Sequence, residues 1–160
     1  MSGGEEMKLS EFYRSVVEIG IDNDPRGRQA LEKELASRKK KADSMPEKKK
    51  PYFDAETLVN PYSDSRILAG SGEEEVKKLM VGIDIDAGEL GVCDRLNEKG
   101  MGIDLVLSHH PSGRALAGLA GVMGMQADML MAAGVPIAVA EDLMDTRIKE
   151  VERRMMPTNH

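Results

Sequence analysis

The feature that most constrains the fold is an alternation of short apolar runs with a capped helical segment, beginning near residue 76. A continuous apolar run at 79–83 predicts a strand buried on both faces. Asp86 and Glu89 then stand at the spacing of a capping box, with Asp in place of Ser or Thr, and predict a helix that ends at Gly100. A second apolar run at 103–107 follows. This order predicts two parallel strands joined by a helix. The inward face of that helix is expected to carry Ala87, Leu90, Cys93 and Leu96.

The alternation continues toward the C-terminus. Residues 113–133 have a helical pattern, residues 135–140 form a third apolar run after Gly134, and a last helix follows. Three glycines within 113–133 indicate either close backbone packing or an interrupted helix: Gly118, Gly121 and Gly124. The last helix is expected to place Leu143, Ile148, Val151 and Met155 inward, with Glu150 and Arg154 paired outside. The expected fold class is α/β, a parallel (mixed) sheet flanked by helices, with three βα units in residues 76–156 preceded by N-terminal helices.

The first 75 residues differ in composition and form a separate helical and loop-rich segment, ahead of the α/β part at 76–160. Residues 8–19 have helical spacing that Gly20 is expected to end. Asp24 and Pro25 resemble an N-cap and first helical position, and predict a largely exposed helix to about residue 42. Residues 66–69 are a brief strand candidate. Two lysine clusters are interpreted as a solvated surface, the alternative being a phosphate- or RNA-contacting patch: Lys39, Lys40, Lys41 and Lys48, Lys49, Lys50.

Composition excludes several classes of protein. The chain has 160 residues, with 22 Lys+Arg against 28 Asp+Glu and a net charge of −6, which argues against nonspecific nucleic-acid binding. Aromatic residues make up 3%, too few for a stacking platform on single strands. The first residues lack the apolar core of a secretory signal, and no stretch approaches the roughly 20 apolar residues of a membrane span. A lone Cys93 excludes a disulfide framework. We therefore expect a cytoplasmic protein with no nucleic-acid or membrane partner.

The residues most suggestive of chemistry are His109 and His110. They follow the second predicted strand, at the carboxyl edge where open α/β sheets place their ligands. Because Pro111 forces a turn there, the two imidazoles can serve one ion or two neighbouring ions, which they could not do inside an extended strand. Imidazole suits Zn, Fe, Ni and Cu, or Mn together with carboxylates. The alternative is that both histidines merely satisfy backbone groups.

Neighbouring residues give weaker signals. Asp84 and Ser108 lie at the same predicted edge and are expected to support the histidines without ligating directly. His160 is a further possible ligand, although its terminal position argues against it. Ser108 does not stand in a G-x-S-x-G turn, so a serine hydrolase is unsupported. The glycines at 82, 88 and 91 do not form a dinucleotide-binding pattern.

Two segments carry a resemblance to a known family. Residues 81–119 read VGIDIDAGELGVCDRLNEKGMGIDLVLSHHPSGRALAGL, and residues 60–85 read NPYSDSRILAGSGEEEVKKLMVGIDI. This stretch resembles the Ngg-interacting-factor-3-like family, whose members are also called GTP cyclohydrolase 1 type 2 homologs. The likeness covers roughly residues 58–160. It rests on a V-G-I-D strand, a helix, and a strand that ends in D-L-V-L-S-H-H-P.

The resemblance implies a dinuclear centre of divalent metal ions (Zn, Fe, Mn or Ni), with His109 and His110 on different ions. It also implies a toroidal homohexamer and metal-dependent hydrolysis of a nucleotide or phosphoester-like small molecule. The family's remaining ligands have no match in this sequence. By this comparison, residues 76–160 are a metal-site half-domain truncated at its C-terminus, whose missing ligands lie beyond His160. The alternative is a non-catalytic metal-binding protein or an oligomeric scaffold.

Overall fold

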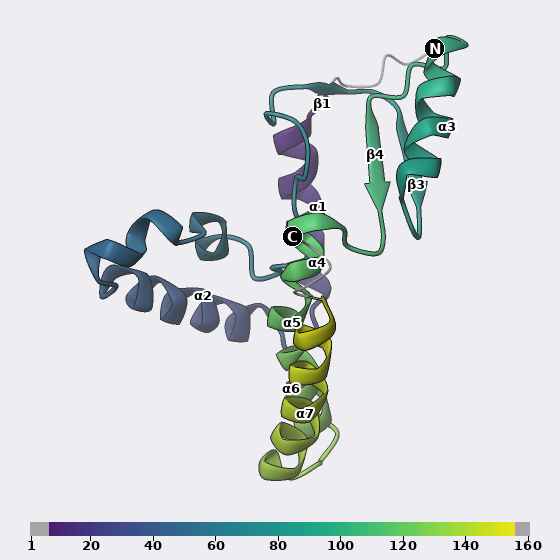
Figure 1. The fold of residues 1–160 in the computed structure, drawn as a ribbon. Coiled ribbons are helices and arrows are strands. Elements are labelled where there is room, and N and C mark those ends of the chain that lie inside the picture. Colours follow the sequence, from purple (N-terminus) through teal and green to yellow (C-terminus); the bar gives the residue numbers. More distant parts are fainter. Residues whose placement is uncertain (1–6, 156–160) are drawn as a thin grey trace.

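The structure, a computed structural model, describes residues 7–155. It has an elongated body with one arm projecting from the middle (Figure 1). The short strands and α3 lie at one end of the body, α6 and α7 run side by side at the other, and α2 forms the arm with the 3₁₀ helices η1 and η2. In chain order the elements are β1 (Met7–Lys8), α1 (Leu9–Asn23), α2 (Arg28–Asp43), η1 (Glu47–Tyr52), η2 (Ala55–Leu58), β2 (Glu75–Val76), β3 (Leu79–Gly82), α3 (Ala87–Glu98), β4 (Leu105–Ser108), α4 (Gly113–Ala117), α5 (Leu119–Val122), α6 (Gly124–Ala132) and α7 (Ile137–Met155).

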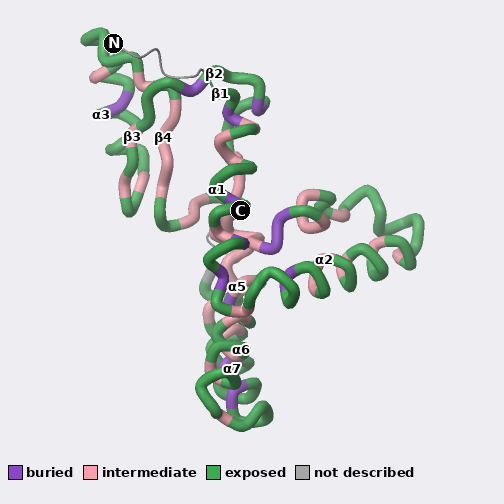
Figure 2. Tube along the Cα trace, turned by 180° about the vertical axis from the view of Figure 1, so that it is seen from behind, coloured by how far each residue is buried: buried purple, intermediate pink, exposed green. Residues whose placement is uncertain are grey.

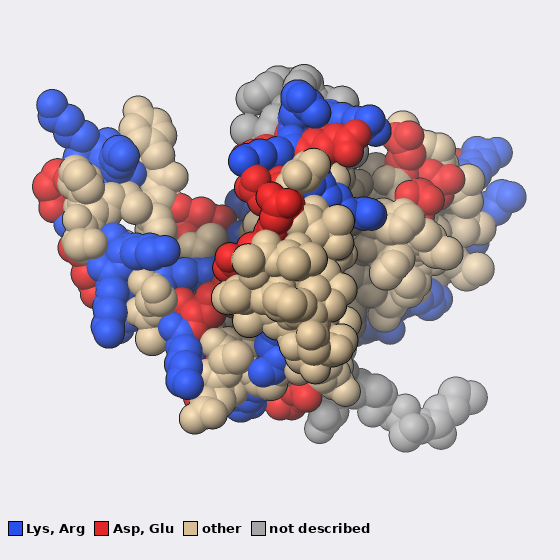
Figure 3. Space-filling model, turned by 90° about the horizontal axis from the view of Figure 1, so that it is seen from below, with Lys and Arg blue, Asp and Glu red and all other residues tan. Residues whose placement is uncertain are grey.

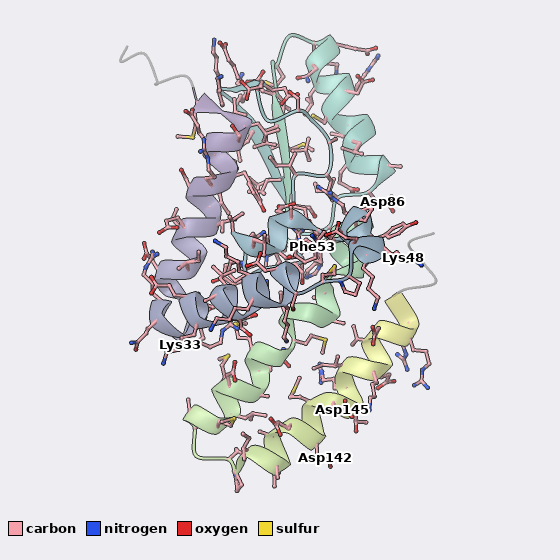
Figure 4. The ribbon with its side chains drawn as sticks, turned by 90° about the vertical axis from the view of Figure 1, so that its left-hand side faces the viewer. Lys33, Lys48, Phe53, Asp86, Asp142 and Asp145 are labelled. Atoms are coloured by element: carbon pink, nitrogen blue, oxygen red, sulfur yellow. The ribbon has the colours of Figure 1, made fainter. Side chains whose placement is uncertain are left out.

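The parallel strand pair is confirmed. β3 and β4 pair in parallel, from Leu79 opposite Leu105 to Gly82 opposite Ser108, and α3 connects them. Asp86 begins α3 with the expected capping box, because its side chain and that of Glu89 bond to each other's backbone N–H groups (Figure 4). β1 and β2 form a separate antiparallel pair. The fold is therefore mixed helix and strand, with one parallel pair flanked by helices.

The third strand expected at 135–140 is not formed, so three βα units are not confirmed. Ile137 begins α7, and the carbonyl of Pro136 accepts the N–H groups of Val139 and Ala140 as a first helical turn does. Proline is tolerated there because the first turn of a helix leaves its N–H groups without intrahelical partners. A short apolar run fits a buried strand and a helix equally well, and here the helix packs against α6.

The expectation that the first strand is buried on both faces is wrong. Leu79 is 40% exposed and Val81 62% exposed, and Ile83 just beyond the strand is 64% exposed. A two-stranded sheet with one connecting helix has no second layer to cover these side chains. Figure 2 shows the same pattern along the chain, with few buried residues. On α3, Cys93 is buried as expected, whereas Leu90 is 52% exposed.

Two residues expected to end or begin a helix in the N-terminal segment, Gly20 and Asp24, have other roles. Gly20 does not end the first helix but lies inside α1, where an added Cβ would lie 3.1 Å from the ring of Tyr62. Asp24 does not cap α2. Its carboxylate accepts hydrogen bonds from Arg26 and Tyr62, and α2 begins after Gly27, whose φ is +79°. The expected exposure of this helix is confirmed, since Leu31 is its one buried residue.

The helix expected over 113–133 is divided into α4, α5 and α6. The backbone of Ser63 approaches so closely that a Cβ on Gly118 would lie 2.3 Å from its carbonyl oxygen, and the Ser63 hydroxyl donates to the carbonyl of Gly118. Both interpretations of the glycines therefore hold in this segment: they permit close packing, and the helix is interrupted. The strand candidate at 66–69 is an irregular segment instead.

In α7 the inward face is formed by Ala140 and Met144, which are both buried, while Leu143 is 61% exposed against expectation. Ile148 and Val151 are half-buried, and the side chain of Met155 lies outside the described set. The outward Glu150–Arg154 ion pair is present at 2.6 Å. Among residues 7–155, no helix is both long enough and apolar enough to cross a membrane.

The lysine clusters lie on the arm. Lys and Arg side chains gather over it at the left of Figure 3, with acidic side chains between them. Lys48 of η1 and Lys33 of α2 both belong to this surface (Figure 4). Lys50 pairs with Glu47 within the same turn.

Candidate metal site

The two histidines lie where the parallel pair ends, and the backbone fixes their place. The N–H of His109 donates to the carbonyl of Gly82 at 2.9 Å, and that of His110 donates to the carbonyl of Ile83 at 2.8 Å. These bonds hold the bend after β4 against the end of β3, so the residues after both strands stay together. Asp84 is thereby brought to the same edge as His110.

A hydrogen bond joins the side chains of Asp84 and His110. The imidazole Nδ1 lies 2.7 Å from the carboxylate Oδ1 of Asp84. In a neutral imidazole, an Nδ1–H that donates to the carboxylate leaves the lone pair on Nε2 to act as an acceptor or a metal ligand. The His110 side chain is 56% exposed, so a ligand can approach it from solvent.

His109 lies against His110. The two ring centroids are 5.1 Å apart and the ring planes are tilted by 35°. The chain has left the strand geometry here, so the alternation of side chains to opposite faces no longer separates them.

Ser108 supports the turn through its hydroxyl. Its hydroxyl Oγ donates to the carbonyl oxygen of His110 at 2.6 Å and lies 3.3 Å from the carbonyl oxygen of Ile83. It therefore ties the residues after β4 to those after β3. This contact fixes the backbone that carries the imidazoles.

The side chains brought together at this edge are those of Asp84, His109 and His110. Within residues 7–155, no three or more His, Cys, Asp and Glu side chains are grouped so that they could hold a metal ion between them. Asp86 is committed to the start of α3, and Cys93 is buried. His160 lies outside the described residues. The described chain thus offers two imidazoles and one supporting carboxylate.

A cavity of about 740 Å³ adjoins the histidines. Its walls come from α1, the segment 62–69, the two parallel strands and the helices after β4, and His109 and His110 lie at its edge. The segment 62–69 contributes Asp64 and Arg66, which the pattern of apolar residues did not single out. A polar run between Pro61 and the apolar residues 67–69 is the signal that could have found them.

The polar groups behind the cavity form a network that is mostly satisfied. The Tyr13 hydroxyl donates to Glu56 and accepts from Asn60, whose side chain is buried. Burial, followed by the hydrogen bond to Glu56, raises the pKa of Tyr13 above its ordinary value. The Arg66 side chain is 4% exposed and forms ion pairs with Asp54 at 3.0 Å and with Glu56 at 2.7 Å. Its Nη1, which faces Glu56, has no partner in hydrogen-bonding geometry within residues 7–155.

Asp64 adjoins this network, since Ser65 hydrogen-bonds to its carboxyl and Arg66 attracts its charge. It is half-buried, and burial raises the pKa of its carboxyl above the ordinary value. Among the described residues it forms no ion pair. Of the two cavity carboxyls, Asp24 has an ion-pair partner among the described residues and Asp64 has none.

Comparison of the chain with models of known protein families, with curated proteins and with solved structures finds no match.

Proposed function

We propose that this protein binds a divalent metal ion through the imidazoles of His109 and His110, as a member of the Ngg-interacting-factor-3-like family would. The observation that carries the proposal is the 2.7 Å hydrogen bond between His110 Nδ1 and Asp84 Oδ1, beside a second imidazole 5.1 Å away. Metal-binding histidines commonly donate their other ring N–H to a carboxylate, which fixes the tautomer and makes the ligating nitrogen more basic. Asp84 is in the position to do this for His110.

The donor set also indicates which metals fit. Two neutral imidazoles with a nearby carboxylate suit Zn²⁺, Fe²⁺, Mn²⁺ or Ni²⁺ better than Mg²⁺ or Ca²⁺, which prefer oxygen ligands. Catalytic zinc sites use three protein ligands and an open position. Two imidazoles from this chain therefore leave positions for water, a substrate, or side chains from outside the described residues.

The activity that fits such a centre is hydrolysis of a small molecule, of the nucleotide or phosphoester-like kind that the family resemblance implies. A bound divalent ion supplies a water of lowered pKa and polarises the bond under attack. This chain's own contribution would be to hold the two imidazoles through Asp84 and Ser108. A second ion on the neighbouring imidazole would make the centre dinuclear.

Calorimetric titration with ZnCl₂ and MnCl₂ tests the metal proposal. We expect the wild-type chain to bind and the double variant His109→Ala/His110→Ala to lose binding. Asp84→Asn should weaken affinity about 10- to 100-fold, because the amide holds the imidazole less well. The matched control is Asp94→Asn on α3, outside the site. Equal affinity in the wild type and the double variant, with the fold intact by circular dichroism, would refute the proposal.

The second candidate, an oligomeric scaffold, is favoured by the exposed surface. The chain exposes 11,356 Å², whereas a compact monomer of 17.5 kDa exposes about 7,900 Å². The excess is larger than the roughly 1,600 Å² that a standard-size interface buries. Light scattering on the preparations used for calorimetry separates the two functions: assembly that survives in the double variant together with no metal uptake by the wild type would favour the scaffold.

A further inference from the structure

The cavity beside the histidines has the size of a ligand pocket. Small-molecule pockets range from about 300 to 1,000 Å³, and this one is about 740 Å³. Residues of α1 and β4 both contribute to its walls. Most of the side chains on its walls are apolar, and examples from each wall are Leu9, Phe12, Val16, Ile67, Leu107 and Val122.

The charges on these walls leave no cation for an anionic ligand. Of the residues that the structure describes, no lysine lines the cavity, and the one arginine that does, Arg66, is already paired with two carboxylates, Asp54 and Glu56. Asp24 is likewise committed to Arg26, at 2.9 Å. In the metal-free cavity a triphosphate or sulfonate would find no side-chain cation to compensate its charge, and desolvating an unpaired charge is costly.

Asp64 strengthens this exclusion. Its half-buried carboxyl lines the cavity and has no ion-pair partner within residues 7–155. A carboxylate in that position repels an anion and accepts a hydrogen bond from a neutral N–H or O–H group. Charge complementarity therefore favours an uncharged body.

We propose that the cavity is a binding pocket for a small organic molecule with an uncharged, largely apolar body, whose polar end reaches His109 and His110. This proposal rests on the proposed function only for the contact between the histidines and the polar end of the ligand. The apolar walls are present without a metal. It narrows the substrate class: a phosphoester bound here carries an apolar group and not a nucleoside triphosphate.

Two fluorescent probes with the same aromatic rings but different charge test which ligand the cavity binds. N-phenyl-1-naphthylamine is neutral, and 8-anilino-1-naphthalenesulfonate adds a sulfonate to the same rings. In metal-free buffer we expect the neutral probe to bind with a stoichiometry of one and at least tenfold more tightly than the anionic probe. Tighter binding of the anionic probe, or binding of GTP that displaces the neutral one, would overturn the proposal.

Variants that narrow the cavity from two independent walls keep the test specific. Val16→Trp on α1 and Leu68→Trp on the segment 62–69 should each weaken the neutral probe at least tenfold, since Val16 and Leu68 are 41% and 48% exposed and line the cavity. The matched control is Val92→Trp, 56% exposed on α3 and outside the lining, which should change nothing. Equal binding in all four proteins would overturn the proposal.

Zinc titration of the same variants separates this proposal from the metal proposal. Probe binding without zinc binding refutes the metal site and leaves the pocket. Zinc binding without probe binding refutes the pocket. If both bind, Co²⁺ should quench the bound probe in the wild type and not in His109→Ala/His110→Ala, and the absence of quenching would refute the link between them. Assembly that breaks in Val16→Trp, with no probe binding in the wild type, would mean that a second copy fills the cavity.

Discussion

At the scale of single residues, Glu74 shows how far one exposed carboxylate can be committed to the backbone. It accepts hydrogen bonds from the N–H groups of Ser71 at 2.7 Å and Gly72 at 2.8 Å, and from the Ser71 hydroxyl at 2.9 Å. The bond from the Ser71 N–H is the largest of the effects that lower the pKa of Glu74 to about 2. The same turn binds the start of α1, because Glu74 and Gly72 offer their carbonyls to Leu9 and Ser10.

Stability should therefore depend on Glu74 in a defined pH window. Because its pKa is lowered in the folded state, its contribution is present above the ordinary value of 4.5 and lost as the pH falls through about 2. We expect Glu74→Gln to lower the melting temperature at pH 7, with the two proteins converging near pH 2. Thermal melts from pH 7 to pH 2 measure this, with Glu75→Gln as the control. A difference that stays constant across the range would contradict it.

Residues whose partners follow from a local motif or from the strand order could be predicted, and those whose partners depend on other long-range contacts could not. The capping box of Asp86 needs only Glu89, three positions away, and both its place and its form were predictable. Asp24 has a local capping signal as well, but its carboxylate bonds to Tyr62, 38 positions away. The order of the strands predicted that Asp84 and His110 lie at the same carboxyl edge. The place of Asp64 in the cavity depends on how residues 62–69 pack against α1 and the strands, which the hydrophobic pattern does not show.

At the scale of elements, two glycines in the same divided helical segment should respond oppositely to the same change. At Gly118 a Cβ would lie 2.3 Å from the carbonyl oxygen of Ser63, so Gly118→Ala should cost about 1–3 kcal/mol of unfolding free energy through overpacking. At Gly124 nothing lies within 4 Å, so Gly124→Ala should add up to about 1 kcal/mol through helix propensity. Urea denaturation measures both. Changes of the same sign would contradict the packing argument.

The elements themselves differ in how well periodicity predicts them. β3, α3 and β4 are predictable because a capped helix separates two short apolar runs, and that order leaves few alternatives. The apolar run at 135–140 is not bounded by a capped helix in this way, and in the structure it begins a helix that packs against α6. β3 is exposed because no further strand or helix of the described chain covers it. Its apolar composition predicts burial, but composition alone does not show whether a covering layer is present.

At the scale of the whole molecule, the segment that carries the histidines has a thin core. Between residues 77 and 112, Cys93 is the one buried residue, whereas α1 and α2 share a cluster of Val17, Ile21 and Leu31. A region with few buried apolar side chains opens at low free-energy cost. The backbone amides of β3 and β4 should therefore exchange hydrogen faster than those of the α1–α2 cluster.

Hydrogen exchange followed by mass spectrometry joins this difference to the metal proposal. A ligand that binds only the folded form stabilises it in proportion to its free concentration over its dissociation constant. Zn²⁺ at 100 times that constant should slow exchange across residues 79–84 and 105–110 by roughly 100-fold, and leave α6 and α7 unchanged. The double variant His109→Ala/His110→Ala should exchange like the zinc-free wild type, whether zinc is present or absent. Protection that is uniform along the chain, or that zinc raises equally in the double variant, would show that neither the thin core nor the histidines control the opening of this segment.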